Sequence, residues 1–196
     1  MELPLKNVDH SLVSAFLERW HPETNNFHMS WGEMTITLHD VHRLTGLTID
    51  GEGLNIVMDK ADLVPRVAEL MGWTAEKVQG EMRASGFHYT DMLTRLDELI
   101  ADPAAPPEHA ATIFLSILLG ATLFIDKSSS RIKPHILPLV FDHQRTPKLA
   151  WGTGALAFLY LSLGQGSRVR AKRIDGFTSL LQVIIMQFAS GIQIRW

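Results

Sequence analysis

The residues best suited to binding a charged partner form a short basic cluster in the last third of the chain. Its members are Arg168, Arg170, Lys172 and Arg173. Four cations within six residues, next to an apolar helix, can contact the phosphates of a nucleic acid or an acidic peptide. A solvated loop between two helices explains the cluster equally well, because no aromatic residues interleave with the cations and the pI is about 6.3. Both interpretations stay open.

Metal and acid–base chemistry have weaker support in the sequence. Nine histidines invite a metal hypothesis, and His39 and His42 share a helix face near Glu33. The chain has no cysteine and no H-E-x-x-H pattern, so histidines that are either solvated or at the edge of the core are the better interpretation. The nearby carboxylates of Glu18, Glu23 and Glu33 are better explained as partners of basic side chains and backbone amides than as a glycosidase pair.

Nucleophilic and nucleotide chemistry lack their usual motifs. The sequence contains neither a G-x-S-x-G elbow nor a G-x-x-x-x-G-K-[ST] phosphate loop. We therefore expect no catalytic residues, no metal and no cofactor, and we interpret the chain as a non-enzymatic interaction module.

The elements that position these residues are mostly helical. The chain has 196 residues, of which 46% are hydrophobic and 20% charged, as in ordinary globular domains. Apolar spacing predicts a mainly α, compact multi-helix domain with a small N-terminal β-hairpin over residues 27–38. Helices are predicted over residues 9–20, 40–45, 60–71, 75–83, 107–125, 151–163 and 174–189, and a further helix is predicted to be capped by Thr90.

The three longest apolar stretches raise the question of a membrane. Residues 110–125 and 149–163 are shorter than a bilayer normally requires, and residues 176–194 contain several polar side chains. We interpret all three as buried core helices and expect no membrane association. The absence of cysteine favours a reducing compartment, either cytosol or nucleus.

The chain length predicts a single domain over residues 1–196, with two subdomains meeting near residues 102–107 as the alternative. Residues 1–102 hold 8 Lys and Arg against 17 Asp and Glu, whereas residues 103–196 hold 10 against 4. Such an asymmetry can pair the two halves of one chain, orient two copies head to tail, or present a basic face to an acidic partner. Pairing within the chain is the simplest of these, and self-association stays open.

Two stretches of sequence together resemble the plant mobile domain, a family also labelled aminotransferase-like. The first is ERWHPET, FH and GEMTITLHDV over residues 18–41, followed by LTGL, and the second is WGTGALAFLY with AKRIDG behind it. The motif residues, for which we expect structural roles, are Arg19, Trp20, Pro22, Glu23, Phe27, His28, Gly32, Glu33, Asp40, Trp151 and Gly152.

The resemblance implies a domain shared between transposable elements and host nuclear proteins of the MAIN type. Host members are associated with transposon silencing, gene expression and meristem maintenance, and they act with a PP7-like phosphatase. The resemblance therefore implies a nuclear scaffold or adaptor with protein partners. Nucleic-acid binding by the basic C-terminal half is the alternative function. The aminotransferase label has no support, because no motif for a pyridoxal-phosphate lysine is present.

Overall fold

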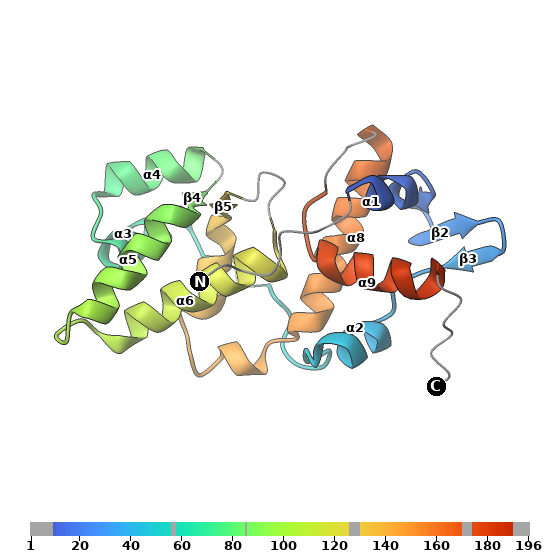
Figure 1. The fold of residues 1–196 in the computed structure, drawn as a ribbon. Helices are drawn as coiled ribbons and strands as arrows, with labels where there is room; N and C mark the ends of the chain where they lie inside the picture. The colour runs from blue at the N-terminus through green and yellow to red at the C-terminus, as the bar shows by residue number, and fades with distance from the viewer. Residues whose placement is uncertain (1–9, 56–57, 85, 126–129, 170–173, 190–196) are drawn as a thin grey trace. The chain divides into compact units, whose positions relative to one another are not determined.

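The computed structural model describes residues 10–55, 58–84, 86–125, 130–169 and 174–189. The prediction of a mainly helical fold with a small N-terminal antiparallel sheet is confirmed (Figure 1). The chain divides into two compact units, which we call unit 1 (residues 1–51 and 150–196) and unit 2 (residues 52–149). Residues 102–107, the candidate boundary in the sequence, join two helices inside unit 2.

Unit 1 combines a three-stranded antiparallel sheet in the order β1-β2-β3 with four helices of its described part. Its elements are α1 (His10–Leu17), β1 (Trp20–His21), β2 (Asn26–Met29), β3 (Gly32–Met34), α2 (Leu38–Thr45), α8 (Trp151–Val169) and α9 (Thr178–Ala189).

The predicted hairpin over residues 27–38 is corrected at both ends. β1 adds a third strand, and β3 already ends at Met34. The alternation of apolar residues continues beyond Met34, but Thr37 begins a helix instead, because Thr37 and Asp40 form a reciprocal capping box. Leu38 therefore belongs to α2 and not to a strand.

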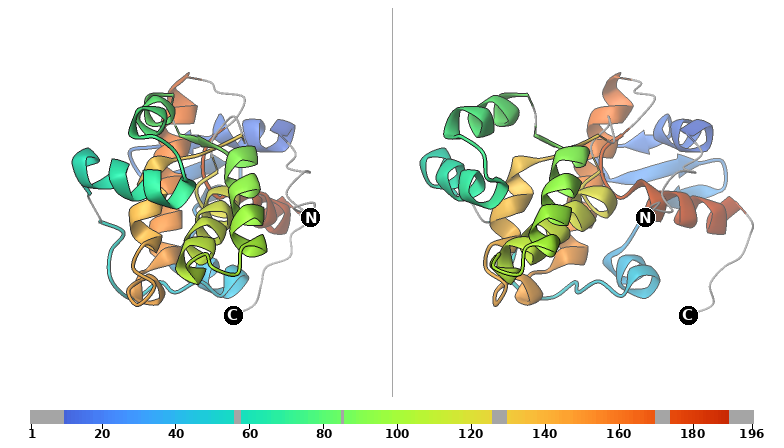
Figure 2. Two further views of the ribbon diagram at one scale, coloured as in Figure 1. Left: turned by 90° about the vertical axis from the view of Figure 1, so that its left-hand side faces the viewer. Right: turned by 60° about the vertical axis from the view of Figure 1, so that its left-hand side comes forward.

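Unit 2 is built from helices joined by short connections (Figure 2). Its elements are α3 (Lys60–Met71), α4 (Ala75–Arg83), β4 (Phe87–His88), α5 (Tyr89–Ala101), α6 (Pro107–Thr122), β5 (Arg131–Ile132), η1 (Pro134–Ile136), α7 (Leu137–Val140) and η2 (Thr146–Lys148). Strands β4 and β5 pair antiparallel, a pairing that the sequence analysis did not predict.

Several helix ends agree with the sequence and others do not. The helices over residues 60–71 and 75–83 are confirmed, and the predicted cap is present because Lys77 N–H donates to the Thr74 hydroxyl at 3.3 Å. Thr90 was the wrong cap, since β4 runs directly into α5 and His88 occupies the cap position. Helix α9 begins at Thr178 and not at residue 174, after Gly176 with its positive φ of 97°.

Each unit has its own apolar core. In unit 1 the completely buried side chains include Phe27, Ile36 and Leu159. In unit 2 they include Val67, Phe87 and Ile113. In the part of the chain that the structure describes, no helix is long and apolar enough to cross a membrane.

Gly86 lies where unit 2 has no room for a side chain. Its φ is 133°, and a β-carbon built on it would lie 2.3 Å from the carbonyl oxygen of Ile132 in β5. Gly80 is its contrast: it lies inside α4, and a β-carbon there would meet no atom within 4 Å. The packing of β4 against β5 therefore requires glycine at position 86, whereas α4 does not require glycine at position 80.

We predict opposite effects of alanine at these two glycines. Gly86→Ala should destabilise the protein by about 2–4 kcal/mol, because it adds both backbone strain and a steric clash. Gly80→Ala should stabilise it by about 0.5–1 kcal/mol, because alanine favours the helix. Chemical denaturation followed by circular dichroism measures both, and equal stability of the two variants would contradict the described packing.

Candidate interaction site

The register of the three-stranded sheet divides the first family motif between two faces. Trp20, Phe27 and Met34 lie opposite one another on the three strands. Because side chains alternate along a strand, the residues next to these three on each strand point to the other face of the sheet. We call this second face the outer sheet face, made of His21, Asn26, His28 and Glu33.

The inner face holds an aromatic cluster. The ring of Trp20 lies 4.7 Å from that of Phe27 at an interplanar angle of 64°, and Phe27 also meets Phe16 edge-on at 5.8 Å. Tyr160 of α8 lies 5.2 Å from Trp20. Trp20 and Phe27 are buried, so these two motif residues hold the sheet on the core.

Tyr160 also binds the sheet through its hydroxyl group. This group donates to the carbonyl of Ile36 and lies 2.8 Å from the hydroxyl oxygen of Thr35, which itself bonds to the carbonyl of Asn25 at 2.6 Å. Burial raises the pKa of Tyr160; the bond to Thr35 acts in the opposite direction, and the charge of Asp40 raises the pKa further. A single side chain of α8 thus fixes the segment that leads from β3 into α2.

The outer sheet face carries a continuous set of polar contacts. The rings of His21 and His28 stack at 3.6 Å with an interplanar angle of 12°. Glu33 lies 3.4 Å from Nε2 of His28 without hydrogen-bond geometry, and it accepts a hydrogen bond from the Asn26 amide at 2.6 Å. Asn26 in turn accepts from the Thr24 hydroxyl at 2.7 Å. The face therefore presents the exposed side chains of His21 and Glu33 to solvent, both held in place by these contacts.

A large aromatic side chain stands at the tip of the same sheet. Trp31 lies in the turn between β2 and β3 and is 67% exposed. Gly32, with its φ of 134°, permits the backbone conformation that closes this turn. Exposed tryptophan is uncommon on monomer surfaces and is enriched at the energetic centres of protein interfaces.

The other N-terminal motif residues lie around this sheet. Arg19 is exposed, and its backbone carbonyl accepts from His28 N–H at 2.9 Å. Glu23 is exposed, Pro22 is half-buried, and Asp40 caps α2.

The second family motif fixes the start of α8. Trp151 is buried there, and Gly152 N–H donates to the carbonyl of Thr48 at 2.8 Å. A β-carbon on Gly152 would lie 3.1 Å from that carbonyl oxygen, so the close approach depends on glycine. The two motifs, distant in sequence, therefore meet within unit 1.

The basic cluster of the sequence is described only at its first residue. Arg168 is exposed near the end of α8. Arg170, Lys172 and Arg173 lie outside the described residues. Among the residues that the structure describes, no group of three or more His, Asp or Glu side chains is placed to hold a metal ion.

Four residues of this site did not emerge from the sequence analysis as site residues: His21, Asn26, Trp31 and Tyr160. His21 lies within the first motif and Asn26 directly precedes its FH pair, and the period of two in β1 and β2 would have placed both on the face opposite the buried ring of Phe27. Tyr160 ends the second motif, but nothing in the sequence links it to its partners, which lie more than 120 residues earlier in the chain.

Comparison with known proteins supports the resemblance found in the motifs. A model of the plant mobile domain matches residues 2–191. The chain belongs to the plant mobile domain family. No solved structure matches the chain significantly.

Its relatives are longer proteins of Arabidopsis thaliana. Protein MAIN-LIKE 1 is 33% identical over 90% of this chain and 35% of its own length, and Protein MAINTENANCE OF MERISTEMS is 32% identical over 90% of this chain and 37% of its own. The serine/threonine-protein phosphatase 7 long form homolog is 33% identical over 90% of this chain but only 13% of its own length. This chain thus spans about a third of the first two relatives.

We predict that both tyrosines of the chain ionise above pH 10 in the folded protein. Burial raises the pKa of Tyr89 and of Tyr160, so the unfolded chain loses these protons first and the stability falls as the pH rises above about 10. Absorbance of tyrosinate near 295 nm measures the titration.

Tyr160→Phe is the matched variant. It should leave one titrating tyrosine, weaken the loss of stability above pH 10 and cost about 1–2 kcal/mol at neutral pH through the unpaired carbonyl of Ile36. A tyrosine that ionises near pH 10 in the folded wild-type protein would contradict the buried environment.

Proposed function

We propose that this plant mobile domain is a non-catalytic, nuclear protein-interaction scaffold or adaptor, linked to transposon silencing, regulation of gene expression and meristem maintenance. The observation that carries the proposal is the outer sheet face with Trp31 at its tip. Its polar groups are ordered by hydrogen bonds before any partner binds, and its aromatic anchor is already exposed. Such preorganisation lowers the entropic cost of association.

The comparisons support a modular role. The same domain makes up 37% of one relative and 13% of another whose name denotes a phosphatase. A domain that occurs in otherwise different proteins is expected to contribute binding. A PP7-like phosphatase is accordingly the partner that we propose to test first.

The chemistry of Trp31 favours a protein partner. An indole offers a large apolar area with few rotatable bonds, so burying it gains free energy at a small entropic cost. The adjacent histidine stack and Glu33 supply polar contacts of the kind found at an interface rim. Protein association is therefore the function that these residues support best.

We predict that Trp31→Ala abolishes capture of partners from plant nuclear extract. The tagged domain is incubated with nuclease-treated extract, and mass spectrometry identifies the bound proteins. Loss of one central tryptophan is expected to weaken binding by about 2 kcal/mol or more, roughly thirtyfold. The folded domain should be unaffected, because this side chain is mostly exposed.

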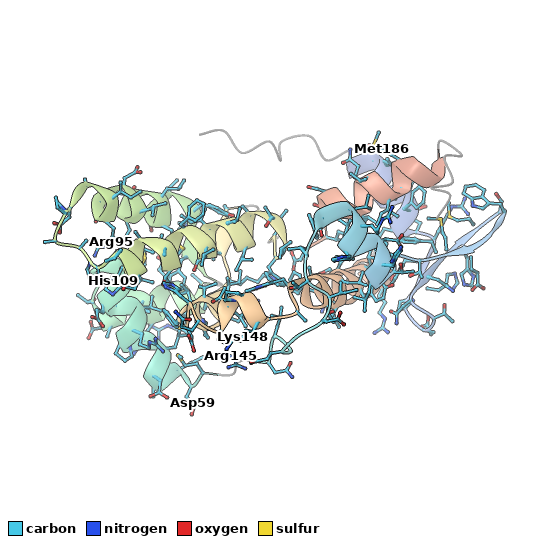
Figure 3. All side chains as sticks on the ribbon, turned by 90° about the horizontal axis from the view of Figure 1, so that it is seen from below. Asp59, Arg95, His109, Arg145, Lys148 and Met186 are labelled. Atoms are coloured by element: carbon cyan, nitrogen blue, oxygen red, sulfur yellow. The ribbon has the colours of Figure 1, made fainter. Side chains whose placement is uncertain are left out.

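Met186→Ala is the matched control. Met186 is 55% exposed on α9 of the same unit (Figure 3). It should capture the same proteins as the wild type, a phosphatase among them. Equal capture by Trp31→Ala and wild type would refute the role of the sheet tip.

The alternative function, nucleic-acid binding, has Arg168 and the basic C-terminal half in its favour. It predicts that partners disappear after nuclease treatment and that binding to mixed-sequence DNA falls steeply with salt. Replacing Arg168, Arg170, Lys172 and Arg173 with Gln should then abolish the binding. No binding to DNA at low salt would exclude this function.

A further inference from the structure

Two helices of unit 2 expose an apolar stripe that the proposed function does not use. Its residues are Leu93 and Ile100 of α5, 45% and 70% exposed, and Phe114 and Leu118 of α6, 50% and 40% exposed. We call these four residues the α5–α6 stripe. The two helices pack side by side (Figure 1).

The spacing of these residues places them along the seam between the two helices. Tyr89, Leu93 and Ile100 are four and seven residues apart, so they share one side of α5. The Tyr89 hydroxyl donates to the carbonyl of Ile117 on α6 at 3.0 Å, which shows that this side borders α6. Phe114 and Leu118 are four residues apart, so they share the exposed side of α6. They flank Ile117 in the sequence. The stripe therefore follows one seam.

The two helices that carry this stripe, with their connection, are rich in carboxylates. Asp97 lies between Leu93 and Ile100 on the same side of α5, is exposed, and forms no ion pair with a described residue. The other carboxylates of the two helices and their connection are Asp91, Glu98, Asp102 and Glu108.

The basic groups of these helices do not balance the carboxylates. Arg95 donates to the carbonyl of Leu70 at 3.0 Å and to Glu98 at 2.9 Å, so its charge is already paired. His109 lies half-buried on α6; Figure 3 labels both residues. The two helices and their connection therefore carry a net negative charge, which makes the electrostatic potential along the stripe negative.

We propose that the α5–α6 stripe binds an amphipathic helix of a partner protein whose apolar face is flanked by lysine or arginine. A seam between two helices accepts a third helix through apolar anchors three and four residues apart. The exposed carboxylates select a basic partner and reject an acidic one. The partner helix covers apolar area that is otherwise in contact with water.

The same charges argue against two other occupants. A second copy bound through the same stripe would bring two equally acidic surfaces together in a two-fold interface, which is repulsive. An anionic membrane surface would be repelled by the same carboxylates. A basic helix is the occupant that both the apolar and the charged groups favour.

The test uses the whole chain and a synthetic helical peptide of about 18 residues with leucines on one face and lysines beside them. Fluorescence anisotropy measures its binding. Two control peptides have the same lysines with scrambled leucines, or glutamate in place of lysine. The wild-type protein should bind only the first peptide.

Substitutions in the stripe should remove this binding. Leu93→Ser combined with Phe114→Ser should weaken it at least about tenfold, and Asp97→Lys should weaken it and reduce its salt dependence. All three side chains are substantially exposed, so the folded state is retained. Val183→Ser combined with Met186→Ser, an exposed apolar pair on α9, is the matched control and should bind as the wild type does.

Three outcomes would overturn the proposal. The wild type fails to bind, the scrambled peptide binds equally well, or light scattering shows a dimer that the stripe variant converts to a monomer. The last result would assign the stripe to a second copy. Trp31→Ala should leave peptide binding unchanged, so failure here is distinguishable from failure of the sheet-tip site.

Discussion

The arrangement of unit 1 depends on the contact between Tyr160 and the segment that follows β3. This one side chain of α8 packs against Trp20, donates to the carbonyl of Ile36 and lies within hydrogen-bond distance of Thr35. A sheet with strands of two to four residues does not persist in water without such support. The helix thus supplies the stability, and the sheet supplies the surface.

That division explains why the first motif contains both buried and exposed residues. Trp20 and Phe27 hold the inner face on the core, whereas His28 and Glu33 lie on the face that the core does not need. Because the inner face carries the packing energy, the outer sheet face and Trp31 are available for the proposed contact with a partner. Alternate residues of the same strands in this way serve the core and the proposed interaction surface.

The sequence was sufficient to predict a helix and its ends where local signals agree, as in the helix that is capped by Thr74 and ends at Arg83. It was insufficient where tertiary contacts decide. The short strand β4 is too brief for a period of two to show, and its pairing with β5 depends on residues more than 40 positions away. The site was predictable in part: the motif marked Trp20, Phe27 and Glu33, but nothing local links Tyr160 to Ile36. The exposure of Trp31 follows from a turn geometry that only the structure shows.

Under the proposed function, partners bind unit 1 at the outer sheet face and its tip. Hydrogen–deuterium exchange of the domain, alone and with a protein partner captured from nuclear extract, tests it most directly. Binding there should slow exchange of the amides in residues 26–34, with little change in the core helix α8. Unchanged exchange in residues 26–34, together with protection elsewhere in the chain, would contradict it.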